Sequence, residues 1–335
     1  MKFIFELSKE HPTIPQSEVV SCLNSERCKY QVIELNPDVM VVDISCDINE
    51  LKNIASRLSH SFSISKMVFS TSTDLKTIKS LTLDNPIDDL GSIAVRCKNR
   101  SILIDSQAIL KALADVYTIN RTVKLQNPDV EVRAIITDSK VYVGVKKYAI
   151  DRQQFEKRKV QFRPFFSPIS LHPKLARALV NLSEIKPGET LLDPFCGTGG
   201  MLIEAGLIGA RIVGSDIDNK LVEGCRENLD FYKIKNYNLF CTDIGNVTEY
   251  VSNIDAVVTD LPYGKSTTTK GEEIKSLYGR AFNSISKVLK DDGKAVIGIP
   301  NKSLLKLSKD LLEIKAIYPV KTHNSLTRYF TVLEL

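Results

Sequence analysis

The chain has 335 residues, enough for two or three domains, and its 43% hydrophobic and 25% charged residues are ordinary for a globular protein. Its apolar runs are shorter than the roughly 18 residues that a membrane helix needs, and the charged start of the chain does not resemble a signal peptide. Seven scattered cysteines without a Cys-x-x-Cys pair argue against a zinc site or a disulfide framework, so we expect a cytoplasmic protein without a bound metal.

The first 150 residues mix short strand patterns with helical ones, which is typical of an α+β region. The expected strands cover 2–7, 65–70, 92–96, 130–136 and 141–145, and the expected helices cover 51–58 and 106–117. A seam near 45–49 divides this region into two small domains, over 1–45 and 46–150. A basic linker over 151–165 follows, where prolines at 164 and 168 disfavour a helix.

From residue 166 onward, strand-like and helix-like segments alternate to the end of the chain. Alternation of this kind predicts a doubly wound parallel sheet, and two closely spaced final strands predict an antiparallel edge. The expected strands cover 190–192, 211–215, 238–242, 254–259, 295–299, 316–322 and 328–333, and the expected helices cover 172–185, 201–205, 221–229, 278–289 and 304–312.

Positive charge is concentrated between Lys140 and Arg163. Eight basic residues against two acidic ones give this stretch a charge of +6, so the rest of the chain nets −1 of the total +5. Such a strip is expected where a protein meets a phosphate backbone, although a solvated linker would show the same charge run. The candidate RNA-binding residues are Lys146, Lys147, Arg152, Lys157, Arg158, Lys159 and Arg163.

A glycine-rich turn, DPFCGTGG at 193–200, follows the first strand of the second half. Its glycines let a ligand approach the backbone closely, but the third glycine of a pyrophosphate-binding turn is missing. Asp216 ends the next strand, where it can accept both ribose hydroxyls, and Asp243 ends the third, where it can accept from an adenine amino group. Three acids in succession favour S-adenosylmethionine over NAD or a purely structural turn. The candidate cofactor-binding residues are Asp193, Pro194, Phe195, Gly197, Thr198, Gly199, Asp216, Ile217, Asp243 and Ile244.

The segment DLPYG at 260–264 follows the fourth strand, at the edge of the sheet where such folds bind ligands. The lone pair of an amine on a base is delocalised, and a carboxylate together with a carbonyl can accept its hydrogens and orient it. We therefore expect Asp260 and the Leu261 carbonyl to hold such an amine, Pro262 to stiffen the turn and Tyr263 to stack on the base. A carboxylate bridges the adjacent donors of guanine, which mildly favours guanine over adenine. A strand-terminal turn remains the structural alternative.

Taken in order, the segment KRKVQFRPFFSPISLHPKLARALVNL at 157–182 and these two motifs resemble the THUMP-containing tRNA guanine-N2 methyltransferases that act on guanine 10, in their archaeal single-chain form. LQNPDVEV at 125–132 and VYVG at 141–144 are similar to the end of a THUMP domain. The resemblance implies a ferredoxin-like domain over 1–45, a THUMP domain over 46–150 and a Rossmann-like class I methyltransferase domain over 166–335. The family motif usually reads Asp-Pro-Pro-Tyr, so Leu261 replaces its first proline and the loop loses one rigid residue.

The resemblance further implies a tRNA substrate, a target base flipped out of its stem and direct transfer of one or two methyl groups. Two other interpretations stay open: a THUMP methyltransferase acting on another guanine N2 or on adenine N6 of tRNA or ribosomal RNA, and a non-catalytic RNA-binding relative. We expect a monomer, with an activating protein partner left open. The segment 264–271 is either a loop that RNA orders or a disordered connection.

Overall fold

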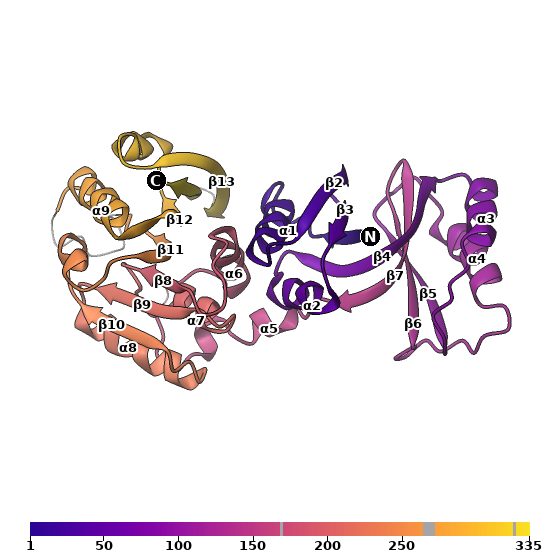
Figure 1. Cartoon of the computed structure of the whole chain (residues 1–335), viewed down its shortest axis with the longest axis horizontal. Coiled ribbons are helices and arrows are strands. Elements are labelled where there is room, and N and C mark those ends of the chain that lie inside the picture. The colour runs from indigo at the N-terminus through magenta and orange to yellow at the C-terminus, as the bar shows by residue number, and fades with distance from the viewer. Residues whose placement is uncertain (168–169, 264–271, 324–325) are drawn as a thin grey trace. The chain divides into compact units, whose positions relative to one another are not determined.

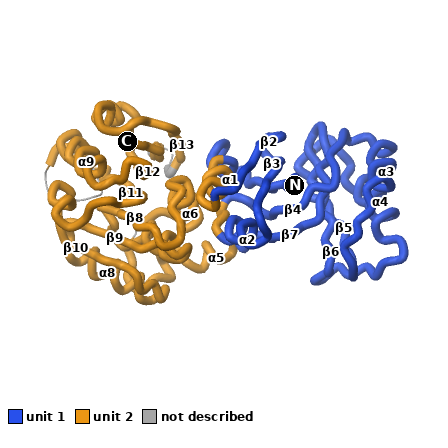
Figure 2. The backbone as a smooth tube through the Cα atoms, viewed as in Figure 1, with its two compact units in different colours: residues 1–16, 27–56, 60–151 blue, residues 17–26, 57–59, 152–335 orange. Residues whose placement is uncertain are grey.

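The computed structural model describes residues 1–167, 170–263, 272–323 and 326–335 (Figure 1). The chain forms two compact units, shown in separate colours in Figure 2. Unit 1 contains residues 1–16, 27–56 and 60–151, and unit 2 contains residues 17–26, 57–59 and 152–335. The segment 264–271, for which we expected either an RNA-ordered loop or disorder, lies outside the described residues. Within the described ranges, no helix is both long enough and apolar enough to cross a bilayer.

Unit 1 is built on one seven-stranded sheet in the order β2-β3-β1-β4-β7-β6-β5. Only β5 and β6 run parallel among these strands. The strands are β1 (Lys2–Leu7), β2 (Lys29–Leu35), β3 (Val39–Ser45), β4 (Ser61–Ser72), β5 (Ile93–Asn99), β6 (Val130–Ile136) and β7 (Lys140–Ala149). β1 pairs with β3 on one side and β4 on the other, so the sheet contains strands from both sides of the predicted division at 45/46, which stays a prediction.

Two helices of unit 1 pack against this sheet through a shared apolar core. Ile78, Ile109 and Leu113 are buried there together with Val132 and other strand residues. The helices of this unit are α2 (Ile48–Arg57), α3 (Leu75–Asp84) and α4 (Ser106–Tyr117). The sequence patterns did not indicate β2, β3, α3 or α1 (Ile14–Ser25), of which most belongs to unit 2. For β2 the reason is exposure, because most of its side chains face solvent and show no regular apolar alternation.

Unit 2 contains the predicted α/β alternation as a second seven-stranded sheet in the order β10-β9-β8-β11-β12-β14-β13. β8 to β12 run parallel, and β14 is antiparallel to both of its neighbours. The last two strands therefore form the predicted antiparallel edge, with β14 between β12 and β13. The strands are β8 (Thr190–Asp193), β9 (Arg211–Asp216), β10 (Tyr237–Cys241), β11 (Ile254–Asp260), β12 (Leu289–Ile299), β13 (Glu313–His323) and β14 (Leu326–Glu334).

Of the five helices predicted for the second half of the chain, four are found as α6 (Pro173–Leu182), α7 (Gly200–Gly206), α8 (Asn219–Phe231) and α9 (Ile274–Val288). The segment predicted as a helix over 304–312 forms the 3-10 helix η3 (Lys302–Ser308), a form that suits short connections. The predicted linker 151–165 contains two short helices, α5 (Gln153–Glu156) and η1 (Val160–Phe162). A further 3-10 helix is η2 (Ile244–Glu249).

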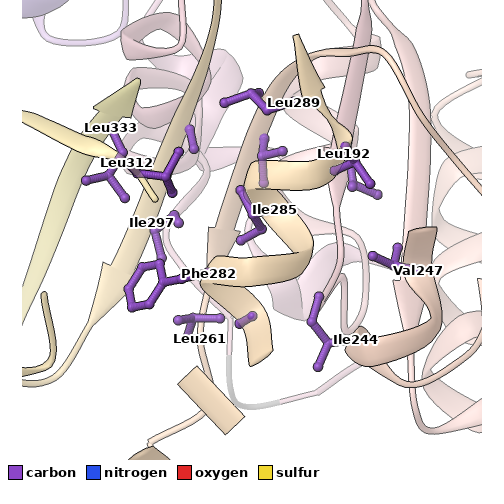
Figure 3. Packing of buried hydrophobic residues seen from close by; sticks show 14 of the residues in the cluster. Leu192, Ile244, Val247, Leu261, Phe282, Ile285, Leu289, Ile297, Leu312 and Leu333 are labelled. Atoms are coloured by element: carbon purple, nitrogen blue, oxygen red, sulfur yellow. The ribbon is translucent and has the colours of Figure 1, made fainter. Parts of the chain in front are cut away.

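A large apolar core lies between α9 and the sheet of unit 2 (Figure 3). Phe282 and Ile285 of α9 are buried there with Leu192 of β8 and Ile297 of β12. Leu261, the first residue after β11, belongs to the same cluster. The core therefore reaches the edge of the sheet where the strands end.

Candidate functional site

Four acidic residues gather where neighbouring parallel strands end. Asp193, Asp216 and Asp260 are the last residues of β8, β9 and β11, and Asp243 follows β10 by two residues. In the sheet these strands are adjacent, in the order β10-β9-β8-β11, and the direction of winding reverses between β8 and β11. A crevice at such a point is where open α/β sheets bind ligands. A cavity of about 640 Å³ is found there, and all four acids line it.

The glycine turn between β8 and α7 places backbone at the wall of this cavity. Gly197 and Gly199 adopt φ angles of 50° and 82°, which L side chains rarely adopt. The Gly197 amide donates to Asp216 Oδ2 at 3.0 Å, and a Cβ on Gly199 would lie 2.7 Å from Cys225 Sγ. The backbone conformation therefore favours glycine at 197, and the contact with Cys225 adds a steric reason for glycine at 199. The predicted residues Pro194, Phe195 and Thr198 also line the cavity.

Asp193 is a buried carboxylate at the centre of this edge. Its Oδ1 accepts from the Thr259 hydroxyl at 2.6 Å and from the Phe195 amide at 3.2 Å. Burial is the main reason that the pKa of Asp193 is raised to about 7, and the charges of Asp216 and Asp260 add to this rise. A carboxylate held in this way favours a cationic ligand group, which would supply the missing positive charge.

Asp216 faces the same cavity with Ile217 beside it. Its Oδ1 accepts from the Asp218 amide at 3.0 Å, opposite the bond from Gly197 to Oδ2. Burial raises the pKa of this carboxyl above its ordinary value. Two fixed carboxylate oxygens with spare lone pairs are suited to accept from a pair of hydroxyl groups.

Asp243 lies at the cavity wall, but its carboxylate already has strong partners. Oδ1 accepts from the Gly245 amide at 2.8 Å, and Arg280 of α9 pairs with both carboxylate oxygens. Arg280 also pairs with Glu272 and, by its hydrogen bonds, lowers the pKa of Asp243. Ile244, which we expected to flank a ring, lines the cavity while most of its side chain is buried in the core. Sequence patterns did not indicate Arg280 or Glu272.

The segment 260–263 continues from β11 into the same cavity. The Tyr263 hydroxyl donates to Asp260 Oδ1, and Arg328 of β14 lies 2.9 Å from Asp260 Oδ2. The Tyr278 hydroxyl donates to the Pro262 carbonyl at 3.1 Å, which holds the turn from the side of α9. Burial raises the pKa of Asp260, while Arg328 and the Tyr263 hydrogen bond oppose that rise.

Leu261 compensates for the proline that it replaces. Its side chain is 1% exposed and belongs to the core cluster that contains Phe282 (Figure 3). Its amide donates to the Gly298 carbonyl at 3.0 Å, a bond that proline cannot make. A hydrogen bond and apolar packing therefore hold the loop at the position where a rigid ring was expected.

A further wall of the cavity comes from the segment ahead of α6, to which the sequence reasoning assigned no role. Ser167, Ser170 and Leu171 line the cavity, and the Ser170 and Thr198 hydroxyl oxygens are 3.2 Å apart. The buried Asn228 amide donates to the carbonyls of Phe165 and Thr198, which joins this segment to the glycine turn.

The basic strip divides into exposed and buried residues. Arg158 and Arg163, predicted to contact RNA, are buried, so their prediction is corrected. Arg158 forms a two-pronged ion pair with Glu204, at 2.8 and 3.0 Å, because a buried carboxylate needs a cationic partner. The Arg163 guanidinium lies close to Gly200, behind the glycine turn. Lys147 and Lys157 are exposed, and the others, partly exposed, are Lys146, Arg152 and Lys159.

One group of potential metal ligands comes together in unit 1, although the cysteine spacing indicated none. Among the described residues, the ligand atoms of Cys28, Cys46 and Glu50 lie within 4.8 Å of one another. The Glu50 carboxylate accepts from the Asp47 amide at 2.7 Å, and Asp47 accepts from the Glu50 amide at 2.9 Å. This reciprocal pair is a capping box for α2, which gives Glu50 a structural role.

Comparison with known proteins identifies relatives of the whole chain. A family model described as an RMKL-like methyltransferase domain matches residues 160–329. The tRNA (guanine(10)-N2)-dimethyltransferase of Methanothermobacter thermautotrophicus is 33% identical over 100% of this chain and 99% of its own. The enzyme of the same name from Methanocaldococcus jannaschii is 34% identical over 98% of this chain and 99% of its own. The crystal structure of TrmN from Thermus thermophilus, 17% identical, shares the fold with a TM-score of 0.59 over 100% and 99% of the two chains.

Proposed function

Because this chain belongs to the family of the tRNA (guanine(10)-N2)-dimethyltransferases, we propose that it transfers methyl groups from S-adenosylmethionine to the exocyclic N2 of guanine 10 in tRNA. The observation that carries the proposal is the shared cavity of about 640 Å³. Its wall includes the glycine turn and three acids on one side and the segment 260–263 on the other. A methyl donor and an acceptor amine can therefore meet in one cavity.

The residues of the cavity fit S-adenosylmethionine, which would supply a methyl group on a sulfonium. The buried Asp193 carboxylate, with its raised pKa, would pair with the ammonium of the methionine part. Asp216 would accept the ribose hydroxyls, and the glycine turn would let the cofactor approach the backbone. Because Arg280 occupies the Asp243 carboxylate, an adenine amino group would bond to an oxygen that is already paired, beside Ile217 and Ile244.

Asp260 and its neighbours would hold the guanine. The Asp260 carboxylate would accept from N1–H and N2–H, and the Leu261 carbonyl would accept the second amino hydrogen. Tyr263 would stack on the base, and Asp260 would take up the proton that the amine loses, directly or through water. In a stem, the guanine amine is reached only when the base leaves the helix, so we include base flipping in the proposal.

We assign tRNA binding to unit 1 and to the exposed part of the basic strip. The ferredoxin-like domain over 1–45 and the THUMP domain over 46–150 remain parts of the proposal, as does the methyltransferase domain over 166–335. Lys146, Lys147, Arg152, Lys157 and Lys159 would contact phosphates and make the affinity for tRNA fall with rising salt. A cytoplasmic monomer is the proposed state, and seven free cysteines are compatible with that compartment.

Labelled methyl transfer to an unmodified tRNA transcript, followed by nucleoside analysis, tests the function. We expect N2-methylguanosine or N2,N2-dimethylguanosine at position 10, and no product from a transcript with another base there. N6-methyladenosine, or a methylated guanine elsewhere, would contradict the proposal and favour another substrate.

Asp260→Ala tests the role given to the second motif. The variant should lose transfer by at least a hundredfold while its affinity for S-adenosylmethionine, measured by calorimetry, stays within about threefold. Asp292→Asn, an exposed acid of β12, is the matched control and should retain both. Loss of transfer and cofactor binding together in Asp260→Ala would show that its role is wrongly assigned.

A further inference from the structure

Arg328 has a position in the cavity that no motif in the sequence indicates. It is 8% exposed and lines the cavity together with Asp260 and Tyr263. Its Nη1 lies 2.9 Å from Asp260 Oδ2, and its guanidinium carbon lies 4.9 Å from the centroid of the Tyr263 ring. One side chain thus contacts both groups that the proposed function places against the base.

The sheet topology explains how a residue so late in the chain reaches this site. β14 runs antiparallel to β12, so its first residues lie at the edge where β11 and β12 end. In the register, Asp260 lies beside Gly298, and Gly298 lies beside Phe330. A Cβ at position 298 would overlap the Asp260 carboxylate and the Phe330 ring, so glycine leaves the space that these two side chains need. The backbone therefore carries Arg328 to Asp260.

Both oxygens of Asp260 are held, each by a different element. Oδ1 accepts from the Tyr263 hydroxyl, and Oδ2 faces Arg328. An ionised carboxylate has about four acceptor sites, so lone pairs remain for a substrate amine. The guanidinium also covers one face of the Tyr263 ring, a favourable cation–π arrangement that fixes the ring plane.

We propose that Arg328 is a positioning residue for methyl transfer. It keeps the Asp260 carboxylate ionised and oriented, and it fixes the orientation of the Tyr263 ring on which the base would stack. The inference rests on the proposed function, because it concerns the same amine pocket. Arg328 acts through Asp260 and Tyr263 and takes no part in the bonds that form and break.

Arg328 is the basic side chain that faces Asp260 among the described residues lining the cavity. Tyr263 faces it from its own loop, Tyr278 from α9 and Asp193 from β8. Burial raises the pKa of Asp260, and Arg328 is the largest influence that lowers it. An opposite charge at this range favours the ionised carboxylate, so removal of Arg328 should raise the pKa of Asp260.

The test is the pH dependence of kcat/KM for tRNA, from pH 5 to 9, in Arg328→Gln and Arg328→Lys. Asp260 must be ionised to accept the amine, so activity falls on the acidic side. In Arg328→Gln this acidic limb should move at least one unit to higher pH, and the rate at pH 7 should fall at least tenfold. Arg328→Lys keeps the positive charge, so the acidic limb of its pH profile should stay within half a pH unit of wild type. Its rate should still fall, because lysine lacks the planar guanidinium that contacts both Asp260 and Tyr263.

Arg226→Gln is the matched control, because Arg226 also combines an ion pair, with Glu223, and a ring contact, with Tyr237. It is 42% exposed and does not line the cavity, so its profile should match that of wild type. Thermal melting and calorimetry with S-adenosylmethionine check that each variant is folded and binds the cofactor. If Arg328→Gln does not fold, Arg328→Lys decides alone, and a shifted limb in that variant overturns the inference.

An equal loss of rate in Arg328→Gln at every pH would also overturn the inference and leave Arg328 a structural residue. Failure of wild-type protein to form N2-methylated guanine would contradict the proposed function instead. The two failures are therefore distinguishable, since the first requires an active wild-type enzyme.

Discussion

Asp193→Asn should stabilise the cofactor-free protein at alkaline pH while it weakens cofactor binding. Both hydrogen bonds that Asp193 accepts, from Thr259 and Phe195, go to Oδ1, which an asparagine retains. The substitution therefore removes the buried charge and keeps the contacts. A rise of the pKa from 3.8 to about 7 corresponds to roughly 4 kcal/mol, at 1.36 kcal/mol per pKa unit.

The sign of the effect follows from where the proton binds. Below pH 3.8 the carboxyl is protonated in both states, and its contribution to stability is fully present. Between pH 3.8 and about 7 the folded state keeps a proton that the unfolded state has released, so this contribution is lost as pH rises. The gain from Asp193→Asn should therefore be small at pH 4.5 and approach a few kcal/mol at pH 8.

Urea denaturation of both proteins without cofactor, at pH 4.5 and 8, measures this gain, with Asp292→Asn as the exposed control. Calorimetry at pH 8 should show at least a tenfold loss of affinity for S-adenosylmethionine, because the ammonium loses its partner. A variant that is less stable than wild type at pH 8, or equally shifted at both pH values, would refute the reasoning.

Two other substitutions test how the amine loop is held. Gly298→Ala places a methyl group against Asp260. It should cost about 1–3 kcal/mol in unfolding free energy and about a hundredfold in kcat/KM, with cofactor affinity retained. Unchanged kinetics would contradict the steric contact described at this glycine. Leu261→Pro removes the hydrogen bond to Gly298 and part of the core packing, so it should lower the unfolding free energy in urea by about 2–4 kcal/mol. Leu261→Met keeps the hydrogen bond and most of the packing, so it should lower the unfolding free energy by less than about 1.5 kcal/mol. Equal stability of those two variants would show that the amide bond and the packing do not hold the loop.

The sequence allowed much of unit 2 to be predicted, because β8, β9 and β11 are largely buried and apolar and each of them ends in an aspartate. Asp193, Asp216 and Asp260 are therefore recognisable from local patterns alone, and all three line the cavity. Arg328 was missed because its partner lies on a strand far earlier in the chain, and only the order of β11, β12, β14 brings the two together.

The basic strip shows a second limit. Charge in a sequence does not report burial, and the ion pair that buries Arg158 could not be foreseen because its partner, Glu204, lies far along the chain in α7. The exposed β2 was missed for a related reason, since it has no regular apolar face. Even the buried strand β3 was missed, so patterns along the chain predict neither every buried element nor tertiary ion pairs.

The packing of Leu261 means that residues outside the loop help to fix the loop's conformation. In a loop with two prolines, the proline rings themselves restrict the backbone conformation, so a short motif determines it locally. Here it depends on side chains such as Phe282, which belong to a helix and do not line the cavity (Figure 3). Repacking of that helix would therefore disturb catalysis from a distance, and the four-residue motif moved into another scaffold would not bring its geometry along.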